Sequence, residues 1–483
     1  MRALTISAVV ALTAVLAPGA AHAAPPSNDD FADATAITSL PFGSVVDTRE
    51  GTAANDDPSS CSWSTSSVWF RYTAPADGFA RMSTDRPDDT KPAISAYTGE
   101  RGALTWVTDA CQQPHGGGSD TFAVKAGTTY HFLLQDTKFA GPVRFGLELV
   151  PRSANDDFAS AADVPMDTTV AGDTGPATVE TGEPKPGCQY PATRSVWFRY
   201  TADRARFVSA KVTQRTSLAS VAVFRGSALN ALTEVDCLHS NYNPAIFAAT
   251  PGETYYVRVA EGIYGGEQLT LRLTEAPEIK PHAMWVRPAQ PGVFDEVKFD
   301  VDPGDPAGRW LTSGLVQFGD GTPDAAISDT NGVVTVSHKY AADGEYDVTI
   351  SGRTADGRSG STTQKVKVET HDVTVSNVAA PATAKVGDTG QVEVSVSNTR
   401  YAEDVVVELL RRRPDGYYNV VGTVRQHVAT DSTAVVPFTY TYTADDAARG
   451  KATLKARVRL DGRDDNNPAD NERTVETTVV AAS

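Results

Sequence analysis

A segment that occurs twice is the strongest constraint on how this 483-residue chain can fold. The matching pieces are SNDDFA at 27–32 and ANDDFA at 154–159, SVWFRYTA at 67–74 and 195–202, and AGTTY at 126–130 with PGETY at 251–255. They keep the same order, and partners are 125–128 residues apart. The chain therefore contains a tandem duplication, and each copy is expected to fold as one unit.

Each copy has the pattern of antiparallel β-structure. Short runs rich in Val, Thr, Tyr and Phe, such as 68–73 and 130–135, alternate with clusters of Gly, Pro, Asp and Ser. No long stretch shows the 3.6-residue apolar period of a helix. Turn signals at such close spacing predict two packed antiparallel sheets in each copy.

The N-terminus has the pattern of a secretory signal. Met1-Arg2 precedes an apolar run from Ala3 to Ala17, and Ala21-His22-Ala23 fits the small-x-small cleavage site. The run is shorter than the roughly 20 residues of a membrane span, and no second apolar run follows it. We expect a cleaved signal peptide at 1–23 and a chain that is secreted to the extracellular space without a membrane span.

The net charge and the cysteines limit the kinds of partner and of chemical site that the chain can have. The net charge of −17 argues against a nucleic-acid partner, because neutralising phosphates needs dense Lys and Arg. The four cysteines follow the duplication: Cys61 and Cys111 are 50 positions apart, and Cys188 and Cys237 are 49 positions apart. Since an exported chain meets oxidising conditions, we expect one structural disulfide in each copy. A redox couple or a metal–thiolate site is the alternative, although neither pair has CxxC spacing.

The two copies resemble the bacterial pre-peptidase C-terminal family. The resemblance rests on the NDDF start, the VWFRYTA strand, the turns YTG at 97–99 and FRG at 224–226, and the AGTTY strand. It implies jelly-roll-like β-sandwiches over 26–150 and 153–275. Such domains accompany secreted hydrolases and occur in longer surface proteins.

Residues 282–369, which follow a Pro-rich hinge, are similar to the PKD family of immunoglobulin-like sandwiches. The motifs are FGDG at 318–321, His338-x-Tyr340, and the strand GEYDVTI at 344–350. Gly319 and Gly321 can supply positive φ around Asp320, whose carboxylate can bond its own turn. Tyr340 is expected to pack beside Tyr346, and His338 to be packed as well.

Residues 371–483 resemble the cell-adhesion-related (CARDB-like) immunoglobulin-like domains of bacteria. Val392, Val394 and Val396 alternate with polar residues, as in a half-buried strand, and the sequence DDNNPADN at 464–471 precedes a last strand. The expected fold class is therefore all-β, with four consecutive β-sandwich domains, two jelly-roll-like and two immunoglobulin-like, after the signal peptide.

The sequence contains two kinds of candidate calcium ligand. Asn28-Asp29-Asp30 and Asn155-Asp156-Asp157 open the two copies, and three oxygen-bearing side chains can contribute to a calcium site. The alternative is that Asn28 and Asn155 cap a helical turn. The second is a cluster of Asp464, Asp465, Asn466, Asp470 and Asn471, which lacks the EF-hand order and is otherwise a solvated loop.

Aromatic residues are the candidates for ligand contact. Trp69 and Trp197 occupy matched strand positions and are expected in the core. Trp63 and Trp106 occur in the first copy alone, so Trp106 is the more interesting candidate. Tyr417 and Tyr418 follow Asp415-Gly416 in an expected loop and form a second candidate.

No catalytic motif accompanies these modules. HExxH, GxSxG, the P-loop, the dinucleotide fingerprint and zinc-type Cys/His clusters are all missing from the sequence. We expect a non-catalytic binding, adhesion or scaffold protein that needs no cofactor, or structural calcium at most. Its partner would be an extracellular or cell-wall polysaccharide or protein. The alternatives are a secreted hydrolase with an unpatterned active site and a calcium-dependent carbohydrate-binding protein.

Overall fold

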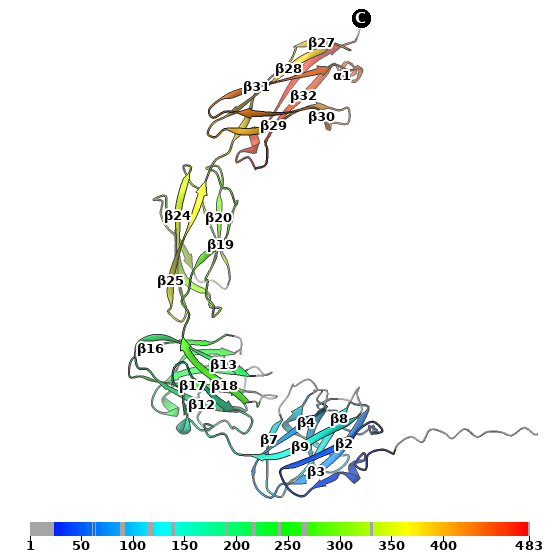
Figure 1. The fold of residues 1–483 in the computed structure, drawn as a ribbon, viewed down its shortest axis with the longest axis vertical. Coiled ribbons are helices and arrows are strands. Elements are labelled where there is room, and N and C mark those ends of the chain that lie inside the picture. Colours follow the sequence, from blue (N-terminus) through cyan, green and yellow to red (C-terminus); the bar gives the residue numbers. More distant parts are fainter. Residues whose placement is uncertain are drawn as a thin grey trace, which may run out of the picture. The chain divides into compact units, whose positions relative to one another are not determined.

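The computed structural model describes residues 24–59, 61–62, 64–86, 92–113, 120–136, 141–188, 192–214, 219–239, 243–262, 266, 268–328 and 332–481. The expected signal peptide and Trp63 lie outside these residues. The regular secondary structure of the described residues is almost entirely β-strand, which confirms the all-β fold class (Figure 1). Residues up to Pro277 form one compact unit, and residues from Glu278 form another.

The first copy of the duplication is a sandwich of two sheets. Its elements are η1 Phe31–Asp33, β1 Thr35–Ile37, β2 Phe42–Asp47, β3 Ser66–Thr73, β4 Gly78–Asp85, β5 Ala93–Thr98, β6 Thr105–Gln112, β7 Thr121–Val124, β8 Thr129–Asp136 and β9 Pro142–Val150. One sheet has the order β1-β3-β8-β5-β6 and the other β2-β9-β4-β7. Phe70 of the first sheet lies 4.5 Å from Phe145 of the second, ring centre to ring centre, so the core lies between the sheets.

The second copy repeats this topology strand for strand. Its elements are η2 Phe158–Ser160, β10 Ala162–Asp163, β11 Thr169–Asp173, β12 Arg194–Thr201, β13 Arg206–Gln214, β14 Ser220–Arg225, η3 Leu229–Ala231, β15 Thr233–His239, β16 Ala245–Ala249, β17 Thr254–Glu261 and β18 Gln268–Glu275. The sheet orders β10-β12-β17-β14-β15 and β11-β18-β13-β16 match those of the first copy. The parallel pair β10–β12 corresponds to β1–β3.

Both expected disulfides are confirmed. Cys61 is joined to Cys111, and Cys188 to Cys237, with a Cα–Cα distance of 5.6 Å in each pair. That distance is typical of disulfides. Each bridge ties the loop before the VWFRYTA strand to the strand after the YTG or FRG turn. This restricts the unfolded chain of each copy at equivalent places.

The segment with the FGDG turn forms a third sandwich. Its strands are β19 His282–Arg287, β20 Val297–Asp302, β21 Leu311–Gln317, β22 Ala325–Ser328, β23 Val334–His338, β24 Gly344–Thr354 and β25 Ser359–Val368. They form the sheets β19-β20-β23 and β22-β21-β24-β25. Phe299 of the first sheet and Ile350 of the second are fully buried in one cluster.

The last segment is a fourth sandwich with one short α-helix. Its elements are β26 Val373–Ala379, β27 Thr383–Lys385, β28 Thr389–Asn398, β29 Glu403–Arg412, β30 Tyr418–Val428, β31 Thr433–Thr441, α1 Ala444–Ala448, β32 Lys451–Leu460, η4 Pro468–Asp470 and β33 Glu472–Val480. The sheets are β26-β28-β31 and β27-β33-β32-β29-β30. As expected, Val392, Val394 and Val396 point into the core. None of the helices described is long and apolar enough to cross a bilayer.

Candidate functional site

The two NDD segments form matching turns, but the asparagines do not cap them. Nδ2 of Asn28 donates to the carbonyl of Trp69, and Nδ2 of Asn155 donates to that of Trp197, both at 2.9 Å. The N-cap residues are Asp30 and Asp157, and neither forms a side-chain cap bond. The expectation that Asn28 and Asn155 cap the turn is therefore wrong. Both amides are buried, and the hydrogen bond to the adjacent strand gives each buried N–H donor a partner.

The middle carboxylate of each turn also has donors from the protein. Asp29 accepts hydrogen bonds from N and Oγ1 of Thr52, both at 2.7 Å. Asp156 accepts from N and Oγ1 of Thr178, at 2.6 and 2.9 Å, and pairs with Arg152. In the part of the chain that the structure describes, no group of three or more His, Cys, Asp or Glu side chains is arranged to hold a metal ion. Calcium at Asn28–Asp30 and Asn155–Asp157 stays a prediction.

The predicted aromatic candidates differ in exposure. Trp69 and Trp197 are buried, as expected. Trp106 is half-buried against the cluster that contains Trp69, and its Nε1 donates to the carbonyl of Ala110 at 3.4 Å. Much of the Trp106 ring is therefore used in packing.

Tyr417 and Tyr418 lie at the turn into β30. Tyr417 is 75% exposed, the highest value among the large apolar or aromatic residues described. Tyr418 begins β30, and Nζ of Lys455 lies 4.5 Å from its ring centre. Tyr417 is thus accessible, while one face of Tyr418 carries a cation–π contact.

The FGDG turn has a structural role. Gly319 and Gly321 have φ of 80°, and Asp320 accepts a hydrogen bond from the amide of Thr322. His338 bonds Asp320 at 2.7 Å and stacks on Phe318, with 3.9 Å between ring centres. Burial raises the pKa of Asp320, but the bonds from Thr322 and His338 outweigh it and hold the pKa below the usual value. These contacts confirm that His338 is packed and leave it little freedom to act on a ligand.

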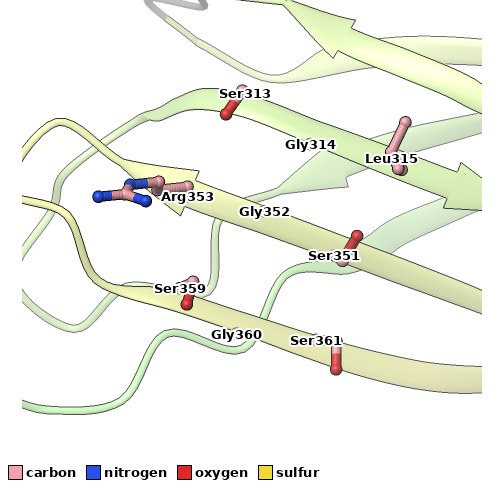
Figure 2. Close-up of a pocket in the computed structure, with 9 residues that line it drawn as sticks. All are labelled: Ser313, Gly314, Leu315, Ser351, Gly352, Arg353, Ser359, Gly360 and Ser361. Carbon is pink, nitrogen blue, oxygen red and sulfur yellow. The ribbon is translucent and has the colours of Figure 1, made fainter.

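An open trough crosses the outer face of the sheet β22-β21-β24-β25 (Figure 2). It has a volume of ≈ 630 Å³. Its lining consists mainly of small residues from three strands: Ser313, Gly314, Leu315, Ser351, Gly352, Arg353, Ser359, Gly360 and Ser361. The serines bring hydroxyl groups to the surface, and Arg353 brings a positive charge, as the sticks in Figure 2 show.

Three glycines lie in register beneath the trough. Gly314 pairs with Gly352, and Gly352 pairs with Gly360. On their inner side these positions have no room for a side chain, since a Cβ on Gly360 would lie 2.1 Å from the carbonyl oxygen of Ile279. Their neighbours on the outer face are mostly serines, so the sheet surface stays low there. The sequence signal is Ser-Gly at 313–314, 351–352 and 359–360, which becomes meaningful once the strand register is known.

The same sandwich has exposed aromatic residues that the sequence analysis did not single out. Trp285 on β19 is 58% exposed, Phe294 is 47% exposed, and Trp310, directly before β21, is 44% exposed. Trp310 is three residues from Ser313 of the trough. Single exposed apolar residues are common on protein surfaces, so exposure alone does not make these three residues a binding site.

Comparisons with known proteins support the third sandwich most directly. Residues 279–370 match the family model of the PKD domain. No curated protein matches this chain.

Three solved structures are similar to parts of the chain. The first is the CARDB domain of a Pyrococcus furiosus protein in complex with di-metal ions, with 20% identity over 24% of this chain and 95% of that chain and a TM-score of 0.20. The second is the sporulation control protein Spo0M of Bacillus subtilis, with 16% identity over 24% of this chain and 51% of that chain and a TM-score of 0.18. The third comes from work on carbohydrate-binding modules of the β-sandwich superfamily, with 16% identity over 41% of this chain and 95% of that chain and a TM-score of 0.16. At these values, the similarities assign neither ligand nor activity.

Proposed function

We propose that this chain is a secreted, non-catalytic binding or adhesion protein that contacts an extracellular or cell-wall polysaccharide through the trough on its PKD sandwich. In this proposal the two copies are accessory modules of the pre-peptidase C-terminal type, and the last sandwich is a CARDB-like module. The observation that carries the proposal is the open, hydroxyl-lined trough across β21, β24 and β25.

The chemistry of the trough suits a polysaccharide strand. Serine hydroxyls both donate and accept hydrogen bonds, as sugar hydroxyls do. Among the described residues, the Arg353 guanidinium has no ion-pair partner, so it is available to a carboxylate or phosphate on the polymer. Trp310 is exposed and precedes Ser313 of the trough by three positions, so its ring can offer an apolar face to a sugar ring.

The test measures binding of the chain from Ala24 onward to neutral and anionic polysaccharides. Ser351→Leu fills the trough and should weaken binding at least about tenfold, which corresponds to ~1.4 kcal/mol. Arg353→Ala should weaken binding to the anionic polymers more than to the neutral ones. Lys298→Ala removes one positive charge from the opposite sheet and should leave binding unchanged. Equal binding by all four proteins would refute the trough as the contact surface.

The same samples test the absence of catalysis. After prolonged incubation, the release of reducing ends, peptides or carboxylic acids from polysaccharide, protein and ester substrates is measured. We expect no release above a buffer blank. Turnover that disappears when a single carboxylate is replaced would support the hydrolase alternative and overturn this proposal.

A further inference from the structure

The beginning of the last sandwich gathers buried oxygens that have no hydrogen-bond partner. Among the described residues, five buried side-chain oxygens lack a partner, and three of them are Oδ1 of Asp372, Oδ1 of Asp470 and Oδ1 of Asn471. The other two, on Gln135 and Tyr200, occur singly. A buried oxygen without a partner costs about 1–3 kcal/mol, so a cation in contact with all three oxygens would stabilise this region.

Backbone contacts bring these residues together from distant parts of the sequence. The amide of Val373 donates to Oδ2 of Asp465 at 3.1 Å, and Oγ1 of Thr374 donates to the carbonyl of Asp470 at 3.1 Å. The first residues of β26 therefore run beside η4. Asn471 is 7% exposed, and its carbonyl accepts from the amide of Val458 at 2.9 Å, which fixes it at the entry to β33.

The region is electrostatically unfavourable for carboxylates alone. Asp372 is close enough to Asp470 and Asp465 for their negative charges to repel one another, and Arg400 offsets this only in part. Asp465 also repels the carboxylate of Asp470, which has a hydrogen bond with the Thr374 side chain. Two neighbouring oxygens already have donors, because Oδ1 of Asp465 accepts from the amide of Asn467 at 2.7 Å and Oδ2 of Asp470 accepts from Nδ2 of Asn467 at 3.0 Å.

We propose that Asp372, Asp470 and Asn471 bind one calcium ion through their side-chain oxygens. The set consists of two carboxylates and one amide, all hard oxygen donors of the kind that calcium takes in sixes to eights, with water completing the shell. With so few protein ligands, we expect a dissociation constant on the order of 10⁻⁴–10⁻³ M, as in extracellular modules. The ion would tie the start of β26 to the loop between β32 and β33.

This site differs from the predicted sites at the two NDD turns. There the middle carboxylates accept hydrogen bonds from a threonine in each copy, whereas here the Oδ1 atoms of Asp372, Asp470 and Asn471 have no hydrogen-bond partner among the described residues. The proposal is also independent of the trough, so either can fail while the other stands.

The experiment measures calcium binding by the full chain from Ala24 onward at pH 7.5. Isothermal titration with calcium chloride and terbium luminescence report affinity. Hydrogen–deuterium exchange of peptides from β26 and from the loop at 461–471 reports the location. We expect saturable binding near millimolar calcium, slower exchange in those peptides, and little effect of magnesium.

Two variants make the test specific. Asp372→Asn keeps the side-chain size and removes one of the repelling charges, so it should fold normally while weakening calcium binding at least about tenfold. Asp464→Asn removes the same charge from an exposed position of the same loop and should bind as the parent does. The proposal is wrong if calcium does not slow exchange in these peptides, or if both variants bind calcium equally well. In that case water, and not calcium, bonds the three oxygens.

Discussion

The two copies surround an equivalent buried tryptophan with different residues. In the first copy the strand pair places Leu133 opposite Trp69, and in the second it places Arg258 opposite Trp197. Leu133 is fully buried, and Arg258 is 3% exposed. The guanidinium of Arg258 pairs with the equally buried Glu183 at 2.6 Å. One framework thus accepts an apolar residue or an ion pair at the same place.

A carboxylate and an arginine occur beside the tryptophan in both copies, although they come from different elements. In the second copy Glu183 accepts from Oγ of Ser195 at 2.8 Å and from Nε1 of Trp197 at 3.3 Å. In the first copy Asp57 accepts from Oγ of Ser67 at 2.6 Å and from Arg101 at 2.9 Å. Arg101 arises from the turn between β5 and β6 and lies 5.6 Å from the ring centre of Trp69.

The duplicated framework therefore fixes the position of a charged group but not whether a strand, turn or loop supplies it. Arg101 is partly exposed and has a second carboxylate, Asp56, at 2.8 Å. Arg258 lies in the middle of a strand, where burial lowers its pKa and Glu183 opposes that effect. The second copy should consequently depend far more on its carboxylate than the first.

The largest predicted effect tests this difference directly. Glu183→Ala leaves a buried guanidinium without its carboxylate and should destabilise the second copy by about 3–5 kcal/mol. Asp57→Ala should cost the first copy about 1 kcal/mol, because Arg101 keeps Asp56 and water. Hydrogen–deuterium exchange of β12 and β3 peptides in the full chain measures both. Similar losses in the two copies would contradict the comparison.

The next effect concerns the two NDD turns. Asp156 is 2% exposed and Asp29 is half-buried, although both bond a threonine. Asp156→Ala should cost about 2–3 kcal/mol and Asp29→Ala about half as much, because water can reach the threonine in the first copy. Denaturant unfolding followed by peptide exchange measures the ratio. A greater loss in the first copy would show that exposure does not govern the strength of these bonds.

A double replacement should abolish the difference between the copies. Arg258→Leu with Glu183→Gln gives the second copy the apolar residue of the first, and its stability should change by less than about 1 kcal/mol or increase. Calorimetry of the full chain compares it with the parent and with Glu183→Ala. A loss as large as that of the single variant would show that the ion pair itself stabilises the fold.

The duplication made part of this structure predictable. Matching motifs at a constant offset implied matching topology, and the paired cysteines implied both disulfides, because equivalent sequence folds to equivalent structure. The burial of Trp69 and Trp197 followed from their matched strand positions. These are local patterns or patterns that a repeat makes visible.

The rest depended on contacts between residues far apart in the sequence. Glu183 lies in a loop without regular structure, so its pairing with Arg258 had no periodic signal. Asp372 is almost a hundred positions from Asp470, and strand β26 brings the two together. Arg411 donates to Asp446, 35 positions further along the chain, at 3.1 Å. In each case the charge was evident in the sequence, but its partner was set by the register of strands.

The smallest predicted effect lies at another position where the copies differ, His131 in the first and Tyr256 in the second. Both rings pack on the phenylalanine of the NDDF turn, at 4.5 and 4.4 Å between centres. Burial lowers the pKa of His131, Arg71 adds to this, and Glu100 opposes it. The unfolded chain therefore takes up a proton first as the pH falls through about 6.5, and the native state loses stability there.

His131→Tyr places the residue of the second copy in the first and removes this titration. At pH 7.5 the two proteins should differ by less than about 1 kcal/mol. At pH 5 the variant should be the more stable of the two relative to that baseline, because the tyrosine stays neutral in both states. Urea unfolding at both pH values, followed by exchange in β8 peptides, measures the difference. A pH-independent difference would show that His131 is protonated as readily in the folded first copy as in the unfolded chain.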